Sequence, residues 1–220
     1  ACEPEVTDLA DLLNKMGAKI DWIDDETARI RGVKELGGAS HAIIPDRIET
    51  GTFLVAGALT AGDFLVRGVV PAHVQSVVDK LRASGTYVEA EGETSLRVVG
   101  AGEIRAQDIT TSPYPGFPTD MQAQFMVLLT QAAGMSIITE TIFDRRFSHV
   151  NELVRLGASI EVQGDKAVVK GQTPLSGAEV VATDLRASAA LVLAGLVAAG
   201  ETTVTEIEHL YRGYERIEEK

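Results

Sequence analysis

The chain has 220 residues, of which 45% are apolar, so its length fits one large domain or two small ones. Its 20 basic and 32 acidic residues give a net charge of −12, which argues against a nucleic-acid partner or an anionic membrane surface. The single cysteine, Cys2, excludes an intrachain disulfide and suits a reducing cytoplasm. The longest apolar run is too short to span a bilayer, and no signal peptide is visible. We therefore expect a cytoplasmic protein.

A one-sided helix, a glycine and a β-hairpin follow one another three times along the chain. The helices are predicted near residues 6–16, 74–81 and 150–156, and each is stopped by a glycine: Gly17, Gly85 and Gly157. An apolar helix that ends at an Ala-Gly pair and leads into a strand also occurs three times. These helices are predicted from Asp46 to Gly62, from Thr119 to Gly134 and from Thr183 to Gly200.

The two patterns alternate with a period of about 70 residues, which predicts an α/β repeat of two helices and four strands. A chance series of βαβ units is the alternative, although matching glycines at six helix ends argue against it. The chain begins inside one repeat and ends inside another, at a helix predicted for residues 209–220. We therefore expect a truncated piece of a longer polypeptide, in which residues 1–44 finish one domain and residues 45–220 form most of a second.

Helices that are apolar on all sides are expected inside, surrounded by sheets and one-sided helices. If the inner helices are parallel, their N-termini meet at one pole, where unpaired N–H groups attract phosphate or carboxylate. Asp120 is predicted in the first turn of the middle inner helix, behind a stiff loop of three prolines. Thr119 is predicted as its N-cap, with Gln122 as the capping-box partner. From spacing alone, Asp120 is either an ordinary helix-start residue or a reactive group.

Six motifs resemble the UDP-N-acetylglucosamine 1-carboxyvinyltransferase family over essentially the whole chain, but only over the later half of the family's length. They are found at residues 1–5, 45–51, 117–124, 143–147, 182–187 and 211–215. The resemblance implies two domains, each an inside-out α/β barrel of βαβαββ units, with the active site between them. It also implies that the enolpyruvyl group of phosphoenolpyruvate is transferred to the 3-hydroxyl of UDP-N-acetylglucosamine and phosphate is released, without metal or organic cofactor.

The resemblance assigns roles that suit the residue types. Asp120 would accept the proton of the attacking hydroxyl and hold the sugar. Guanidinium groups bind carboxylate and phosphate in bidentate fashion, so Arg146 and Arg186 would hold the carboxylate and Arg212 the phosphate side. The remaining matches are an acid near the reacting methylene, two cleft positions and a backbone contact to the sugar nucleotide: Asp184, Arg47, Glu3 and Ile142.

Several of these residues also have an ordinary structural interpretation. Asp184 could be only a first-turn acid, and Arg212 could belong to an exposed face of an amphipathic segment. Arg186 is harder to explain by structure alone, because an unpaired buried charge is costly. The histidines show no metal-ligand spacing. Tyr114 stands where relatives often have histidine, and Cys2 is not in the motif of the family's reactive cysteine.

Two other functions remain open. The first is the sister enolpyruvyl transferase of the shikimate pathway, which would share the fold and phosphoenolpyruvate but use another acceptor. The second is a non-catalytic repeat module that binds anions or a partner at its helix pole. If the resemblance holds, the early half of the enzyme is the missing partner of this chain. The 220 residues alone should then be inactive.

Overall fold

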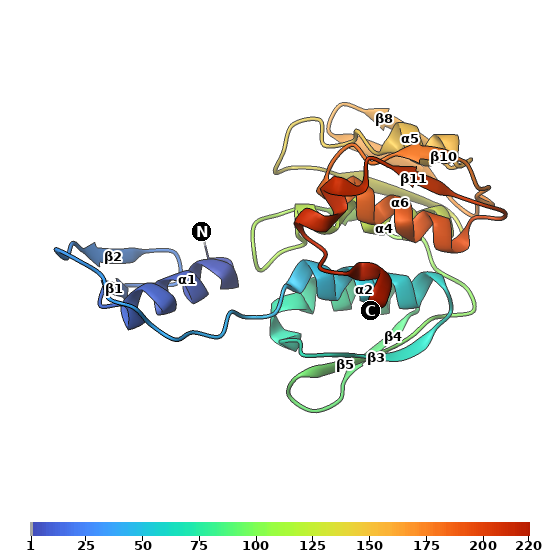
Figure 1. Ribbon diagram of the computed structural model, residues 1–220. Helices are drawn as coiled ribbons and strands as arrows, with labels where there is room; N and C mark the ends of the chain where they lie inside the picture. Colours follow the sequence, from blue (N-terminus) through green and yellow to red (C-terminus); the bar gives the residue numbers. More distant parts are fainter. Residues whose placement is uncertain (1) are drawn as a thin grey trace.

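The computed structural model describes residues 2–220, which form a small and a large part (Figure 1). In the small part, helix α1 (Pro4–Lys15) precedes a hairpin of β1 (Lys19–Trp22) and β2 (Ala28–Arg31). An extended segment at residues 32–46 joins it to the large part. The small part touches the large one through Cys2, whose Sγ donates to the carbonyl of Tyr114 at 3.0 Å, and through an ion pair of Glu5 with Arg47 at 2.8 Å.

The centre of the large part consists of three inner helices that pack against one another: α2 (Arg47–Leu59), α4 (Gln122–Thr130) and α6 (Leu185–Val197). Every residue of α4 is buried, as its apolar composition predicts. The N-terminal ends of the inner helices lie at the same end of the bundle, because Asp46, Asp120 and Arg186 line one pocket. The expected buried helices with a common pole are therefore confirmed.

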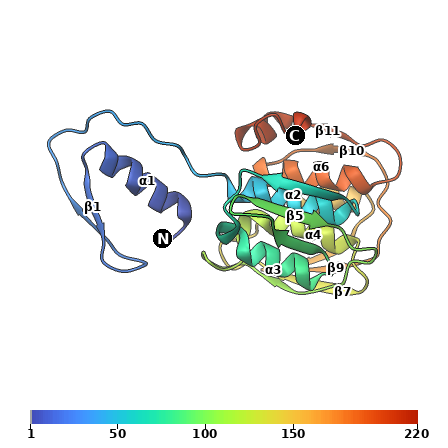
Figure 2. The same cartoon turned by 90° about the horizontal axis from the view of Figure 1, so that it is seen from below.

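Sheets and one-sided helices surround the inner helices (Figures 1 and 2). One sheet has the order β3-β5-β4 and a second has the order β6-β7-β9-β8, while β10 and β11 form a parallel pair. The strand bounds are β3 Asp63–Arg67, β4 Tyr87–Ala90, β5 Ser95–Val99, β6 Ile109–Thr110, β7 Met135–Thr139, β8 Ser159–Gln163, β9 Lys166–Lys170, β10 Glu179–Val181 and β11 Thr203–Thr205. The outer helices are α3 (Gln75–Ala83) and α5 (Val150–Arg155). Helices inside and sheets outside are the inside-out α/β arrangement that the repeat predicts.

The start of α4 differs from the prediction. A 3₁₀ turn (η2, Thr119–Met121) precedes the helix, and Thr119 caps no backbone N–H group. The Thr119 hydroxyl donates instead to Glu140, and the Gln122 side chain donates to Glu140 and to the carbonyl of Arg146. The predicted capping box is therefore wrong, because both side chains bind a loop that is distant in sequence.

The C-terminal segment also differs from the prediction. Residues 209–220 were expected to form one helix, but they form parts of two 3₁₀ segments, η3 (Ile207–Arg212) and η4 (Ile217–Glu219). Between them, Gly213 approaches Leu185 so closely that a Cβ atom would lie 2.7 Å from its Cδ1. Tyr214 is completely buried beneath this bend. Packing on α6 therefore overrides the helical pattern of the sequence.

Candidate functional site

The site is centred on the carboxylate of Asp120, which is held between two guanidinium groups. Arg146, from the loop after β7, donates from Nη1 to Oδ1 at 2.8 Å, and Arg186, in the first turn of α6, donates from Nη2 to Oδ2 at 2.8 Å. The Asp120 side chain is 34% exposed, against 26% for Arg146 and 13% for Arg186. Three residues that are far apart in sequence thus meet in a partly dehydrated cluster, where charge pairs interact more strongly than in water.

The two arginines control the protonation of Asp120. Burial by itself raises the pKa of this carboxyl, but the charge of Arg186 and the hydrogen bond and charge of Arg146 outweigh it. The pKa of Asp120 is therefore below its ordinary value, and the side chain is ionised at neutral pH. In turn, Asp120 and Tyr214 outweigh the burial of Arg186 and raise its pKa.

Asp184 occupies a different position, at the N-cap of α6. Its Oδ1 accepts the backbone N–H groups of Arg186 at 2.8 Å and Ala187 at 2.9 Å, while Oδ2 accepts the hydroxyl of Ser148 at 3.2 Å. Asp46 caps α2 in the same way. Asp184 is thus a true capping residue, and its Oδ2 accepts only the long hydrogen bond from Ser148.

A pocket of about 500 Å³ opens over this cluster. Its charged lining residues are Asp120, Asp144, Arg146, Asp184, Arg186 and Arg212. Arg212 is exposed at the end of η3, and its guanidinium makes no ion pair with any of residues 2–220. The pocket therefore offers three guanidinium groups, two engaged with Asp120 and one open to an anion.

The other predicted residues lie around this cluster at varying distances. Arg47 borders a second pocket together with Asp120 and Arg186, pairs with Glu5 and lies over the ring of Tyr114 at 5.6 Å. Ile142 is partly exposed, and its N–H group donates to Glu140 at 2.8 Å. Glu3 precedes α1 as its N-cap residue without a side-chain capping bond, and within residues 2–220 it has no hydrogen bond to the Asp120 cluster.

Two buried polar groups beside the site were not expected from the sequence. Glu140 is only 4% exposed and accepts hydrogen bonds from five groups, including Thr119 and the backbone of Ile142. Tyr214 is fully buried, and its hydroxyl contacts Thr52 at 2.9 Å and the Gln124 side chain at 3.2 Å. The signal for Glu140 was its place directly after an apolar strand. Tyr214 lies in the motif at residues 211–215, but nothing in the sequence indicated its burial.

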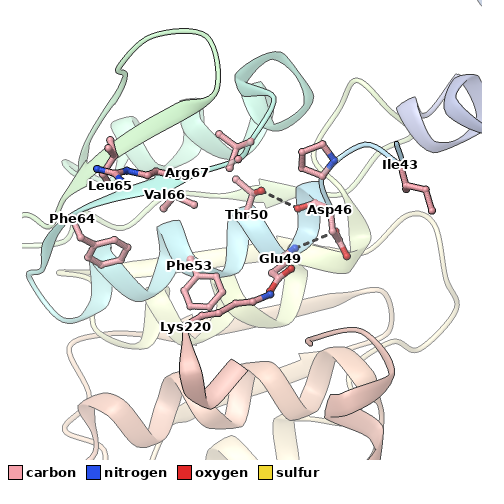
Figure 3. Close-up of a pocket in the computed structure, with 13 residues that line it drawn as sticks. Ile43, Asp46, Glu49, Thr50, Phe53, Phe64, Leu65, Val66, Arg67 and Lys220 are labelled. Atoms are coloured by element: carbon pink, nitrogen blue, oxygen red, sulfur yellow. Dashed lines mark hydrogen bonds and ion pairs between the residues drawn. The ribbon is translucent and has the colours of Figure 1, made fainter. Parts of the chain in front are cut away.

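Another pocket, of about 470 Å³, lies away from the charged cluster, between α2 and β3 (Figure 3). Figure 3 shows Phe53 and Phe64 along it, together with Glu49 and Lys220, whose ion pair measures 2.6 Å. Neither Asp120 nor any of its two arginine partners lines this pocket. Its position therefore separates it from the charged site.

Residues 2–220 show neither a metal-binding cluster nor a membrane-spanning helix. No three His, Cys, Asp or Glu side chains in this part of the chain are grouped so that they could hold a metal ion. None of its helices combines the length and apolar character needed to cross a membrane.

Comparison with known proteins identifies similar chains over the full length. The family described as EPSP synthase (3-phosphoshikimate 1-carboxyvinyltransferase) matches residues 1–220. The UDP-N-acetylglucosamine 1-carboxyvinyltransferases of Koribacter versatilis and Anaeromyxobacter sp. strain K are 56% and 60% identical over 220 residues, which are 51% and 52% of their lengths. The chain therefore spans about half the length of the curated relatives it matches.

Solved structures agree with the fold. The crystal structure of the enolpyruvyl transferase NikO from Streptomyces tendae has a TM-score of 0.86 and 30% identity, and the match covers 99% of this chain and 52% of that one. EPSP synthase from Acinetobacter baumannii has a TM-score of 0.70 at 18% identity, with 93% and 51% covered, which supports the fold alone. The expected enolpyruvyl transferase fold is thus confirmed.

Proposed function

We propose a function from the premise that this chain belongs to the EPSP synthase (3-phosphoshikimate 1-carboxyvinyltransferase) family. As part of a longer polypeptide, it transfers the enolpyruvyl group of phosphoenolpyruvate to the 3-hydroxyl of UDP-N-acetylglucosamine and releases phosphate, the committing step of peptidoglycan synthesis. The main support is the ionised Asp120 held by Arg146 and Arg186 beside the free guanidinium of Arg212. The choice of acceptor is supported by relatives of 56–60% identity that carry this name.

The reaction needs both an anion site and a proton acceptor. Arg146 and Arg186 bind the carboxylate of phosphoenolpyruvate, and Arg212 binds its phosphate. As the acceptor hydroxyl attacks C2, Asp120 takes its proton, while the double-bond electrons move to the methylene carbon, which takes up a proton. In the second step the methyl group loses a proton and the C–O bond to phosphate breaks, which restores the double bond. Asp184, which lines the same pocket, is the acid that we place beside this methylene.

An ionised carboxylate between two arginines is a weak base. Its basicity increases when the two arginines exchange Asp120 for a substrate carboxylate. Both guanidinium groups donate to Asp120 at 2.8 Å in the ligand-free cluster. The carboxylate of phosphoenolpyruvate competes for these donors when it binds. Loss of hydrogen bonds and the added negative charge both raise the pKa of Asp120. Binding of phosphoenolpyruvate therefore makes Asp120 a better base for the acceptor hydroxyl.

The domain division belongs to this proposal as well. Residues 1–44 complete a first domain, residues 45–220 form most of a second, and the acceptor binds in the cleft between them. Arg47, Glu3 and the backbone of Ile142 contribute to that cleft. The other half of the enzyme is the required partner, and the substrates together with the single cysteine support a cytoplasmic location.

The test is a phosphate-release assay on the polypeptide that carries this chain together with the half that its relatives possess. With phosphoenolpyruvate present, release should depend on UDP-N-acetylglucosamine, and shikimate 3-phosphate should not replace it. The 220-residue chain alone should release none. Turnover with shikimate 3-phosphate would reassign the acceptor. If neither acceptor supports release, the chain is an anion-binding module.

A further inference from the structure

We propose that Glu140 is a positioning residue, whose carboxylate fastens the loop of residues 141–147 to the 3₁₀ turn at residues 119–121 and thereby keeps Arg146 on Asp120. The inference deepens the proposed function and rests on it for the roles of Asp120 and Arg146. Glu140 itself touches neither of these two side chains within hydrogen-bond distance, so it acts through Thr119 and the loop backbone.

Donors from three chain segments converge on the Glu140 carboxylate, although the residue is only 4% exposed. Oε1 accepts from the Thr111 hydroxyl at 2.8 Å and from the N–H groups of Ile142 at 2.8 Å and Phe143 at 3.2 Å. Oε2 accepts from the Thr119 hydroxyl at 2.8 Å and from the Gln122 amide at 3.4 Å. All five donors are uncharged, so hydrogen bonds alone compensate the burial of this carboxylate.

The direction of these bonds requires an acceptor at both carboxylate oxygens. A hydroxyl has a single proton to donate. The Thr119 hydroxyl accepts from Arg146 Nη1 at 2.8 Å, and the Thr111 hydroxyl accepts from the N–H of Thr141 at 2.8 Å. Their protons are therefore both free to point at Glu140. The Arg146 guanidinium is thus connected to Glu140 through one hydroxyl.

A second set of contacts also holds Arg146 in position within the loop. The guanidinium of Arg146 lies 5.1 Å from the ring centroid of Phe143, whose backbone N–H is bound by Glu140. Gln122, which also reaches Glu140, donates to the carbonyl of Arg146 at 3.0 Å. Both ends of the short loop are therefore tied to the turn that carries Asp120, which restricts the guanidinium to one position.

Replacement by glutamine breaks this arrangement in either orientation of the amide. If the amide nitrogen faces Thr119, the hydroxyl proton of Thr119 and the amide of Gln122 lose their acceptor. If it faces the other side, the N–H groups of Ile142 and Phe143 lose their acceptor. A buried donor without a partner costs about 1–3 kcal/mol, so the loop is released on one side. Aspartate retains the charge but is too short to span both segments.

The test is a ¹³C NMR titration of the Asp120 carboxyl in the polypeptide that contains both halves and in its Glu140→Gln variant. Loss of a nearby negative charge would by itself lower the pKa of Asp120. Loss of Arg146 from its position would raise it. We expect the pKa to rise, so the sign separates positioning from direct electrostatics. An unchanged or lower pKa would overturn the proposal. The titration involves no turnover, so its result is independent of whether the transfer assay succeeds.

Glu152→Gln is the matched control, because Glu152 is also buried, at 8% exposure, and accepts a backbone N–H from Val181 at 3.0 Å. It should leave the Asp120 titration unchanged, and an equal shift in both variants would show a merely structural effect. If Glu140→Gln does not fold, Thr119→Val and Thr119→Ser replace it. The valine variant should raise the pKa of Asp120. The serine variant keeps the hydroxyl, so the pKa should stay at the parent value. A raised pKa in the serine variant would also contradict the proposal.

Discussion

The starts of α4 and α6 present the same residue type in two opposite arrangements. Asp184 is the N-cap of α6, and one of its oxygens is fully engaged by two backbone N–H groups. Asp120 lies in a 3₁₀ turn ahead of α4, caps nothing, and turns both oxygens toward guanidinium groups. The difference arises in the preceding residues, because Thr119 binds Glu140 instead of the helix. A carboxylate that does not cap a helix keeps both oxygens for contacts within the site.

The largest expected effect is the loss of turnover when Asp120 becomes asparagine. A positioned general base contributes about 10²- to 10⁴-fold in rate, so Asp120→Asn should lose this amount in the two-half polypeptide. Asp184→Asn should lose less, because asparagine keeps the cap and only one weakly bound oxygen changes. Steady-state phosphate release measures both variants. Equal losses, or a larger loss for Asp184→Asn, would remove the functional distinction between the two helix starts.

The next effect concerns His149, a buried imidazole whose pKa is affected by the charges of Asp184 and Arg146. Burial lowers its pKa to about 4, against the raising effect of Asp184 and with a further lowering by Arg146. The unfolded chain takes up a proton near pH 6.5, whereas the folded chain resists it until about pH 4. The contribution of His149 to the free energy of unfolding is therefore fully present above pH 6.5. It decreases by about 3 kcal/mol as the pH drops to 4.

Urea unfolding at several pH values measures this loss. His149→Leu should remove most of the stability change between pH 6.5 and 4, since no imidazole then remains to be protonated. His209→Leu, at a partly exposed position that lines the pocket over Asp120, is the control and should retain the change. An unaltered pH dependence in the His149 variant would show that other groups are responsible.

A smaller effect follows from the capping difference itself. Asp184→Ala should lower the free energy of unfolding by about 1 kcal/mol, and Asp46→Ala by a similar amount, because each removes the acceptor for two backbone N–H groups. The asparagine variants at both positions should stay within a few tenths of 1 kcal/mol of the parent. Urea unfolding at neutral pH measures all four. An Asp184→Ala variant with the same free energy of unfolding as the parent would contradict the capping role.

The smallest effect is expected at Arg145, next to the arginine that binds Asp120. Its side chain is 89% exposed and lies 3.9 Å from Asp144. Arg145→Gln should change the KM for phosphoenolpyruvate by about twofold or less, since exposed pairs contribute little. Arg146→Gln should raise it strongly. Similar KM values for the two variants would mean that the position of Arg146 does not matter for substrate binding.

The sequence predicted those parts of the molecule that depend on repeated local patterns. These are the inner helices and the hairpins after Gly17, Gly85 and Gly157. The grouping of Arg146 and Arg186 with Asp120 was implied only by the family resemblance, and the structure brings the three side chains together. The failures share one cause, which is competition from contacts distant in sequence. Glu140 binds the side chains expected to cap α4, and the packing of Gly213 on Leu185 interrupts the expected C-terminal helix.

The most direct test of the account is the ionisation of Asp120 with and without phosphoenolpyruvate. Asp120 and Asp184 can be followed together by ¹³C NMR titration in the two-half polypeptide labelled at aspartate. We predict that phosphoenolpyruvate raises the pKa of Asp120 from its lowered value, because the substrate carboxylate takes up the guanidinium donors, while that of Asp184 changes little. A pKa of Asp120 that stays the same or falls on binding would contradict the account.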